Sequence, residues 1–273
     1  MSASVSRRAY GKINLFLRIV GTKDGYHLIE SLMQSIDLFD EVTLEKREDD
    51  LVTSDFPEDN SLVVLRRLKQ EFALGGMHLS TKKNIPIGGG LGGSSADAAA
   101  AALACAELWG LNVEKVKTIV APLFGDLAFG LTGGTAIVRG FGEQVECLPD
   151  LPVFQVLLAL PEKGVSTKEA YALSDTLPKG NGSALSLFWA LMRGEKADRH
   201  YLNDLFAPAI KLNQEIFPLL QSIKKTDPLL SGMSGSGSTV FALYKTKEQA
   251  EKAASTLSCK TLVTHTISPC LGK

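Results

Sequence analysis

A dense run of glycines has the strongest chemical potential in this sequence. Residues 86–97 read Pro-Ile-Gly-Gly-Gly-Leu-Gly-Gly-Ser-Ser-Ala-Asp, directly before an alanine-rich segment. Glycine loses more backbone entropy on folding than any other residue, and a plain linker has no need to place so many of them here. Free backbone N–H groups at a helix N-terminus carry about half a positive charge and attract anions. The pattern favours a phosphate cradle, with a tight turn between closely packed small residues as the alternative.

Two common phosphate motifs do not describe this glycine loop. Gly88, Gly90 and Gly93 have the spacing of the dinucleotide fingerprint, but that motif directly follows a buried strand, and residues 82–86 (Lys-Lys-Asn-Ile-Pro) do not form one. No acidic residue ends a strand about 20 positions later, since Glu114 belongs to the start of a predicted helix. The Walker motif needs Gly-Lys-Ser/Thr after the loop, which is absent. If the loop binds phosphate, it does so through a motif of another kind.

The element behind the glycine loop is a predicted helix over residues 95–109. Ser94 or Ser95 can cap its N-terminus, and the alanines at 98–102 are strong helix formers. Gly110 ends it. A helix placed here presents its N-terminus to whatever the loop binds.

Near the N-terminus, alternation predicts a strand over residues 13–20, followed by a turn at 21–25. The period of two places Lys12, Asn14 and Phe16 on the face opposite the isoleucines and leucines. Asn14 can therefore hydrogen-bond the same ligand as Lys12, or orient Lys12. The alternatives are a solvated strand start for the lysine and a buried hydrogen-bond network for the asparagine.

The rest of the chain alternates between predicted strands and helices. Further strands are predicted over residues 33–39, 41–46, 77–81, 135–138, 153–160, 239–244 and 261–267, and helices over 61–74, 113–123, 167–174, 183–193, 212–224 and 246–257. The mixture indicates an α+β protein with α/β character.

Length and composition allow two domains. The chain has 273 residues, enough for one large domain or two modest ones. Pro149 and Pro152 bracket a predicted junction, so we expect domains at 1–148 and 149–273. A second Ser/Gly loop, residues 231–238, precedes the final strand–helix–strand unit.

Charge and cysteine usage exclude several classes of protein. Lys plus Arg is 29 and Asp plus Glu is 30, a net charge of −1 that gives no general attraction to nucleic acid or to a membrane surface. The cysteines, at 105, 147, 259 and 270, are scattered as in a reducing compartment. The longest uncharged apolar stretches are about half the roughly 20 residues of a membrane span. We expect a cytoplasmic protein that binds neither nucleic acid nor membrane; the oligomeric state is not indicated.

Three motifs together resemble the GHMP kinases, the family of galactokinase and of the homoserine, mevalonate and phosphomevalonate kinases. They are Lys-Ile-Asn-Leu at 12–15, the glycine loop with its serines and alanine at 86–96, and Leu-Ser-Gly-Met-Ser-Gly-Ser-Gly-Ser-Thr-Val-Phe at 230–241. The resemblance implies a two-domain GHMP kinase fold. Its N-terminal domain would be ribosomal-protein-S5-domain-2-like, its C-terminal domain ferredoxin-like, and its active site would lie in the cleft between them.

Further segments are similar to one branch of that family, whose substrate is 4-diphosphocytidyl-2-C-methyl-D-erythritol. They are Asp-Gly-Tyr-His at 24–27, Gln34, Asp37, Gly-Phe-Gly-Glu at 140–143 and Asn-Asp-Leu at 203–205. The resemblance implies ATP-dependent phosphorylation of the 2-hydroxyl of that small molecule, in isoprenoid precursor biosynthesis by the non-mevalonate route. The alternatives are another small-molecule kinase of the family, of the homoserine or mevalonate-pathway type, and a non-catalytic nucleotide-binding regulator on the same fold.

The resemblance also assigns roles to residues. Asp126 would accept the proton of the acceptor hydroxyl, and Lys12 would stabilise the developing negative charge; a helix cap or turn residue is the alternative for Asp126. The cofactors would be ATP and Mg²⁺, the ion being held mostly by phosphates and water, since the sequence has no metal-ligand cluster. The ATP-binding residues would be Pro86, Gly88, Gly89, Gly90, Leu91, Gly92, Gly93, Ser94, Ser95 and Ala96. The substrate-binding residues would be Asn14, Tyr26, His27, Tyr171, Ser234 and Gly235, with Tyr26, His27 and Tyr171 at the cytidine. The alternatives are an ordinary helix-face tyrosine for Tyr171 and a tight turn for Ser234 and Gly235. The serine pair is shifted by one position from the usual pattern, so the serine that meets the phosphate or metal stays open.

Overall fold

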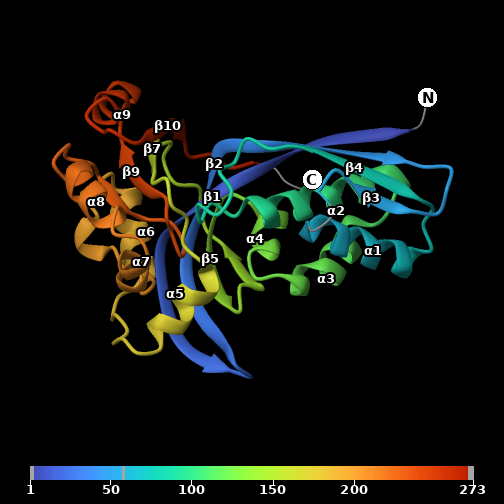
Figure 1. Cartoon of the computed structure of the whole chain (residues 1–273), viewed down its shortest axis with the longest axis horizontal. Coiled ribbons are helices and arrows are strands. Elements are labelled where there is room, and N and C mark those ends of the chain that lie inside the picture. The colour runs from blue at the N-terminus through green and yellow to red at the C-terminus, as the bar shows by residue number, and fades with distance from the viewer. Residues whose placement is uncertain (1–2, 57–58, 270–273) are drawn as a thin grey trace.

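The chain folds around two β-sheets, one in each half (Figure 1). The computed structural model describes residues 3–56 and 59–269. Cys270 lies outside these residues. Of the other cysteines, Cys105 is buried in the first half, and its burial raises the pKa of the thiol to about 12.

A long antiparallel hairpin forms the spine of the N-terminal half. Its strands are β1 (Ser4–Lys23) and β2 (Tyr26–Lys46), which pair from Ser4 with Glu45 to Lys23 with Tyr26. Asp24 and Gly25 both have positive φ, which suits the two-residue turn between strands of right-handed twist. The two strands predicted at 33–39 and 41–46 are thus one continuous strand, because β1 pairs with it along its whole length.

A register shift in this hairpin overturns one expectation. Phe16 was predicted to share a face with Lys12 and Asn14, but it is buried in the same cluster as Ile13 and Leu15. Asn14 pairs with Met33 and Phe16 with Leu32, so Leu15 is an extra residue in β1. Such a bulge interrupts the alternation of faces, which a sequence pattern of period two does not reveal.

The remaining N-terminal elements complete the first sheet and cover it. One edge of β2 pairs with β4 and β5, and the sheet order is β3-β4-β2-β5-β6 with β1 beside β2. Helices α1 to α4 pack on the same side of this sheet (Figure 1). The elements are β3 (Val52–Ser54), α1 (Asn60–Phe72), β4 (Met77–Lys82), α2 (Gly93–Trp109), α3 (Val113–Val120), η1 (Ala121–Leu123), α4 (Leu127–Thr132), β5 (Thr135–Gly140) and β6 (Gln144–Cys147).

Helix α2 is the buried centre of this half. Its residues from Ala96 to Ala106 are all buried, because small side chains let the sheet and the other helices approach closely. The helix begins two residues earlier than predicted. Its N-cap is Gly92, which has no side chain to cap it, so Ser94 and Ser95 lie in the first turn instead of capping the helix.

The C-terminal half has the predicted ferredoxin-like arrangement. Its antiparallel sheet has the order β10-β7-β9-β8, and the helices before β8 and before β10 give the β-α-β-β-α-β sequence of that fold. The elements are β7 (Gln155–Leu160), α5 (Thr167–Ser174), α6 (Ala184–Met192), η2 (Asp198–His200), α7 (Phe206–Leu212), α8 (Ile216–Lys224), β8 (Leu230–Met233), β9 (Val240–Tyr244), α9 (Lys247–Ala254) and β10 (Lys260–His265).

The two halves share a hydrophobic core. One cluster joins Ile13 and Phe16 of the first half to Phe188 and Phe241 of the second. The boundary between 148 and 149 falls in the segment linking β6 to β7, and it stays a prediction. Across the described ranges, none of the helices has the length and apolar character needed to cross a membrane.

Candidate active site

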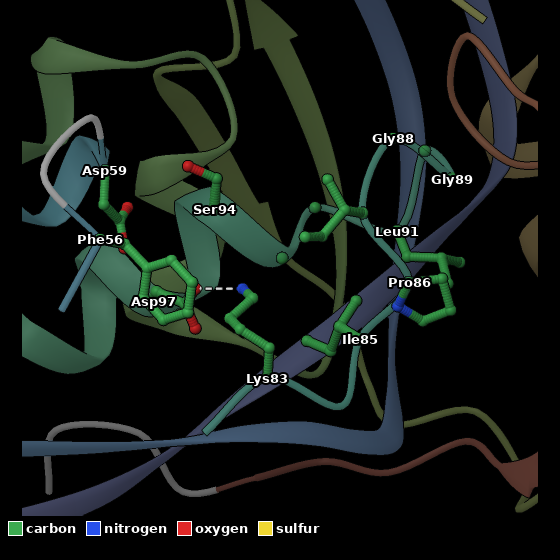
Figure 2. A pocket seen from close by; sticks show the side chains of 14 residues that line it. Phe56, Asp59, Lys83, Ile85, Pro86, Gly88, Gly89, Leu91, Ser94 and Asp97 are labelled. Carbon is green, nitrogen blue, oxygen red and sulfur yellow. Dashed lines mark hydrogen bonds and ion pairs between the residues drawn. The ribbon is translucent and has the colours of Figure 1, made fainter. Parts of the chain in front are cut away.

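Two cavities lie on either side of the glycine loop. The first has a volume of about 700 Å³ and is lined by Phe56, Lys83, Ile85, Pro86 and Asp97 among others (Figure 2). The second has a volume of about 550 Å³. The polar and ionisable side chains that line it are Lys12, Asn14, Asn60, Ser94, Ser95, Asp126, Thr167, Tyr171 and Ser236. The residues that line both cavities are Gly88, Gly90, Gly92, Gly93 and Ser94.

Close packing requires glycine at two positions of the loop. Gly90 has φ +75°, and a Cβ atom there would lie 2.2 Å from the Ser234 carbonyl oxygen. Gly92 has φ +73°, and its Cβ would lie 2.9 Å from Cε of Lys12. Both conformations are strained for residues other than glycine. The loop therefore packs closely at these positions, which brings its backbone against Lys12 and is compatible with either interpretation of the loop.

The N-terminus of α2 suits a phosphate. The first turn of a helix has N–H groups without an intrahelical acceptor. In α2 these belong to Gly93, Ser94 and Ser95, since the bond from the Ala96 N–H to the Gly92 carbonyl comes after them. The wall between the two cavities is thus built of backbone donors at the positive end of a 17-residue helix. The site fits a phosphate chain that reaches from one cavity to the other.

Lys12 is almost fully buried and its ammonium has three oxygen partners. Nζ lies 2.5 Å from Asn14 Oδ1, 3.1 Å from the Gly90 carbonyl oxygen and 3.3 Å from Asp126 Oδ2. Asn14 and Gly90 accept hydrogen bonds from the ammonium, and Asp126 forms an ion pair with it. Two of them fix the amino group to the strand and the loop, and the third partner, Asp126, lies on the side of the second cavity.

Asp126 stands at the entrance of α4 and lines the second cavity. It occupies the N-cap position, but its side chain makes no capping hydrogen bond, so the helix-cap alternative is not supported. About a third of the side chain is exposed, at 32 %, against 7 % for Lys12. Its charge is felt by Tyr171, since burial first and Asp126 second raise the pKa of that phenol. The carboxylate is reachable by a ligand and faces a fixed cation.

Ser234 and Gly235 are neighbours in the sequence, but only Gly235 lines the second cavity. The Ser234 hydroxyl accepts from the Asn14 N–H at 3.2 Å and donates to the Gly90 carbonyl at 2.9 Å. It is fully buried and outside the lining of the second cavity, so its hydroxyl joins β1 to the glycine loop. Gly235 lines the cavity, and a Cβ there would lie 3.5 Å from Lys12 Nζ.

The three aromatic residues assigned to the cytidine gather at the hairpin tip. The rings of His27 and Tyr171 stack with centroids 4.8 Å apart, and His27 Nε2 lies 2.6 Å from Asp175 Oδ1. Tyr26 is 69 % exposed and meets Phe141 edge to face. Tyr171 and Phe141 line the second cavity, whereas Tyr26 and His27 stand outside its lining. The stacked pair leaves no space for a base between its own two rings.

A buried ion cluster in the first cavity was not predicted from the sequence. Lys83 Nζ lies 2.5 Å from Asp40 Oδ2 and also pairs with Asp97, as the dashed line in Figure 2 shows. Asp40 and Asp97 are fully buried, and Asp40 Oδ1 accepts from the Ile85 N–H at 2.7 Å. Burial raises the pKa of Asp97 to about 7, against the opposing effect of Lys83. Two lysines directly before the loop were the available signal, but only the fold brings Asp40 and Asp97 to one of them.

The oxygen atoms around the second cavity are compatible with a magnesium ion that is held mainly by phosphates. Among residues 3–56 and 59–269, His, Cys, Asp and Glu side chains form no group of three that could hold a metal ion. The Ser94 hydroxyl and the Asp126 carboxylate line the same cavity as the α2 N-terminus. Mg²⁺ is commonly held by one or two protein oxygens together with phosphates and water.

The chain belongs to the GHMP kinase family. Residues 60–138 match the GHMP kinase N-terminal domain and residues 186–263 match the GHMP kinase C-terminal domain. GHMP kinases are ATP-dependent kinases of small molecules, and this chain is one of them. A 4-diphosphocytidyl-2-C-methyl-D-erythritol kinase of Desulfitobacterium hafniense is 39% identical over 260 residues, covering 90% of this chain and 89% of that protein. One of Pelotomaculum thermopropionicum is 34% identical and covers 97% and 99%.

Solved structures agree with this assignment. The crystal structure of a 4-(cytidine 5'-diphospho)-2C-methyl-D-erythritol kinase superposes with a TM-score of 0.83 at 28% identity, covering 96% of this chain and 99% of that one. A homoserine kinase from Cytophaga hutchinsonii gives 0.68 at 18% identity, which shows the fold alone. The predicted fold class, with its ferredoxin-like second domain, is confirmed.

Proposed function

We propose that this kinase transfers the γ-phosphoryl group of ATP to the 2-hydroxyl of 4-diphosphocytidyl-2-C-methyl-D-erythritol, in the non-mevalonate route to isoprenoid precursors. Relatives with that activity in their names align along nearly the whole chain. The structural observation that carries the proposal is the pair formed by Lys12 and Asp126, 3.3 Å apart in a cavity that shares its wall with a second one. Two cavities with a common wall suit a donor and an acceptor.

The first cavity is the proposed site of the nucleotide base. It is lined by apolar side chains such as Phe56, Ile85 and Ile87, with the Lys83 and Asp97 charges at its side. A nucleotide seated there directs its phosphates along the loop, toward the α2 N-terminus. The loop residues 86–96 are then close to the phosphate chain, as the family resemblance implies. Backbone N–H groups bind the phosphates there without the desolvation of additional side-chain charges.

The second cavity is the proposed acceptor site. Phosphoryl transfer needs positioning and charge stabilisation more than covalent chemistry from the protein. Asp126 accepts the proton of the acceptor hydroxyl, since its carboxylate is accessible and its partner Lys12 is fixed. Lys12 stabilises the negative charge on the transferring group. Asn14 and Gly235 shape the wall next to the ammonium.

ATP would supply the phosphoryl group, and a bound Mg²⁺ would supply positive charge against its phosphates. The Ser94 hydroxyl is the protein oxygen that would hold the ion, together with phosphates and water. The cytidine of the acceptor would stack against the aromatic cluster at the hairpin tip. Because the His27 and Tyr171 rings already contact each other, the base would use an outer face of this pair or the exposed ring of Tyr26.

A substrate panel tests the proposal. ADP release is measured with purified protein, ATP, Mg²⁺ and, in turn, 4-diphosphocytidyl-2-C-methyl-D-erythritol, homoserine and mevalonate. We expect turnover with the first compound only. Turnover with another compound alone would assign the chain to another branch of the family, and ATP binding without turnover on any compound would make it a nucleotide-binding regulator.

A further inference from the structure

Behind the Lys12–Asp126 pair lies a chain of buried hydrogen bonds. The Ser31 hydroxyl donates to the Phe16 carbonyl at 2.6 Å and accepts from Asn14 Nδ2 at 2.8 Å. Asn14 Oδ1 in turn accepts from Lys12 at 2.5 Å. Ser31 is on β2, is fully buried and does not line either cavity of the site. Its hydroxyl is therefore available to neighbouring protein groups and not to a ligand.

The single proton of the Ser31 hydroxyl decides the direction of these hydrogen bonds. A serine hydroxyl has one proton, which Ser31 donates to the Phe16 carbonyl, so toward Asn14 it can only accept. Nδ2 of Asn14 must then face Ser31, which leaves Oδ1 to face the ammonium of Lys12. The opposite orientation of the amide would place two acceptors together at Ser31 and two donors together at Lys12.

We propose that Ser31 is a positioning residue for phosphoryl transfer, which holds the Asn14 amide so that its oxygen fixes Lys12 against Asp126. This inference rests on the proposed role of Lys12. Without the Ser31 hydroxyl, Asn14 Nδ2 is a buried donor without its partner, a state that proteins avoid. The amide then turns toward the other acceptors nearby, the Gly90 carbonyl and the Asp126 carboxylate, and competes with Lys12 for them.

The bulge in β1 gives this arrangement its geometric basis. The register shift falls between Asn14, whose amide donates to Ser31, and Phe16, whose carbonyl accepts from Ser31. Bulges commonly redirect side chains next to active sites. Here the extra residue, Leu15, lets Asn14 face the cavity while Phe16 is in the core.

The test compares Ser31→Ala with Ser35→Ala, a matched control. Ser35 is also buried on β2, where its backbone pairs with that of Lys12, and its hydroxyl accepts from the Gly134 N–H at 3.0 Å and makes no hydrogen bond to Asn14. We expect Ser31→Ala to lower kcat by about 10- to 100-fold, the range for a small misplacement of a catalytic group. The KM for ATP should stay within about twofold. Ser35→Ala should lower thermal stability similarly and keep kcat within about twofold.

A double-mutant cycle separates positioning from a general structural effect. In an Asn14→Ala background, Ser31→Ala should reduce kcat by less than about twofold further, because the group that it positions is gone. Should Ser31→Ala not fold, Ser31→Cys keeps the size with a weaker hydrogen bond and should show an intermediate loss of kcat.

Equal kcat for Ser31→Ala and Ser35→Ala, or full additivity with Asn14→Ala, would overturn the inference. Wild-type protein without turnover on the substrate panel would instead overturn the proposed function, so the two failures are distinguishable.

Discussion

Replacement of Asp126 by asparagine tests the proposed chemistry most directly. The asparagine has the same shape, and its Oδ1 can still accept from Lys12 Nζ, which lies 3.3 Å from the aspartate oxygen. The two hydrogen bonds from the ammonium to Asn14 and Gly90 are then kept, while the variant loses the negative charge of Asp126 and its ability to take a proton. General-base catalysis contributes about 10²- to 10⁴-fold, so kcat should fall by that factor, equivalent to about 2.7 to 5.4 kcal/mol in the activation free energy.

The same variant should change folding and nucleotide binding little. With 32 % of the Asp126 side chain exposed, water screens its ion pair with Lys12, and such pairs contribute about 1 kcal/mol or less to the free energy of unfolding. The first cavity is not touched, so the Kd for ATP, measured by calorimetry, should stay within about threefold.

The assay is ADP release at saturating ATP and acceptor. Asp37→Asn is the matched control, since Asp37 is also a part-exposed carboxylate near a nitrogen atom, 3.8 Å from His265 Nε2, but lies outside both cavities. It should keep wild-type kcat. If Asp126→Asn keeps kcat within about threefold of the wild type, Asp126 is not the proton acceptor. A large loss of ATP affinity would show that asparagine does not preserve the setting of Lys12.

Three further predictions concern the loop, the ion cluster and the aromatic cluster. Gly90→Ala should destabilise the protein by about 2 to 4 kcal/mol, because its Cβ would lie 2.2 Å from the Ser234 carbonyl oxygen; chemical denaturation measures this, and a loss below about 0.5 kcal/mol would contradict the close approach. Because the pKa of Asp97 is raised to about 7, its contribution to stability is present below about pH 4 and is lost as pH rises to about 7. The free energy of unfolding of the wild type, relative to that of Asp97→Asn, should therefore fall over that pH range by about 2 to 4 kcal/mol. Parallel curves of unfolding free energy against pH for the two proteins would refute the raised pKa of Asp97. Tyr171→Leu should raise the KM for the acceptor about 10- to 100-fold while Tyr171→Phe, which keeps the ring, stays near wild type; equal effects of the two variants would argue against stacking.

Local signals in the sequence were sufficient for much of the fold. The helix after the glycine loop is predicted from local signals. The alanines at 98–102 favour helix in their own segment, and Gly110 ends it. The helix at 167–174 matches α5, since its boundaries are also set by local capping at Ser166. The sequence predicts a Ser/Gly loop where the structure has strand β8. Leu230–Met233 has few residues of high strand propensity, and its pairing with β9 makes it a strand.

The same distinction applies to the site. Asp126 was expected near Lys12 through the family resemblance, and the 3.3 Å approach agrees. The Ser31 chain of bonds and the pairing of Lys83 with Asp97 depend on contacts between distant segments, so no local pattern indicates them. Ser234 was assigned to the substrate from its motif, whereas in the fold its hydroxyl is already used between Asn14 and Gly90. A sequence pattern identifies the residue types at a site but not which of their atoms remain free.

The junction between Gly90 and Ser234 has a consequence for engineering. The glycine loop belongs to the first half of the chain, yet Ser234, whose hydroxyl donates to the Gly90 carbonyl, comes from the second, and the hydrophobic core crosses the same boundary. A chimera that combines residues 1–148 of this chain with the second half of a relative would therefore have to import or preserve both sides of that junction. A chimera of two GHMP kinases should fold where the exchanged halves have compatible residues at these contacts, whatever their sequence identity elsewhere.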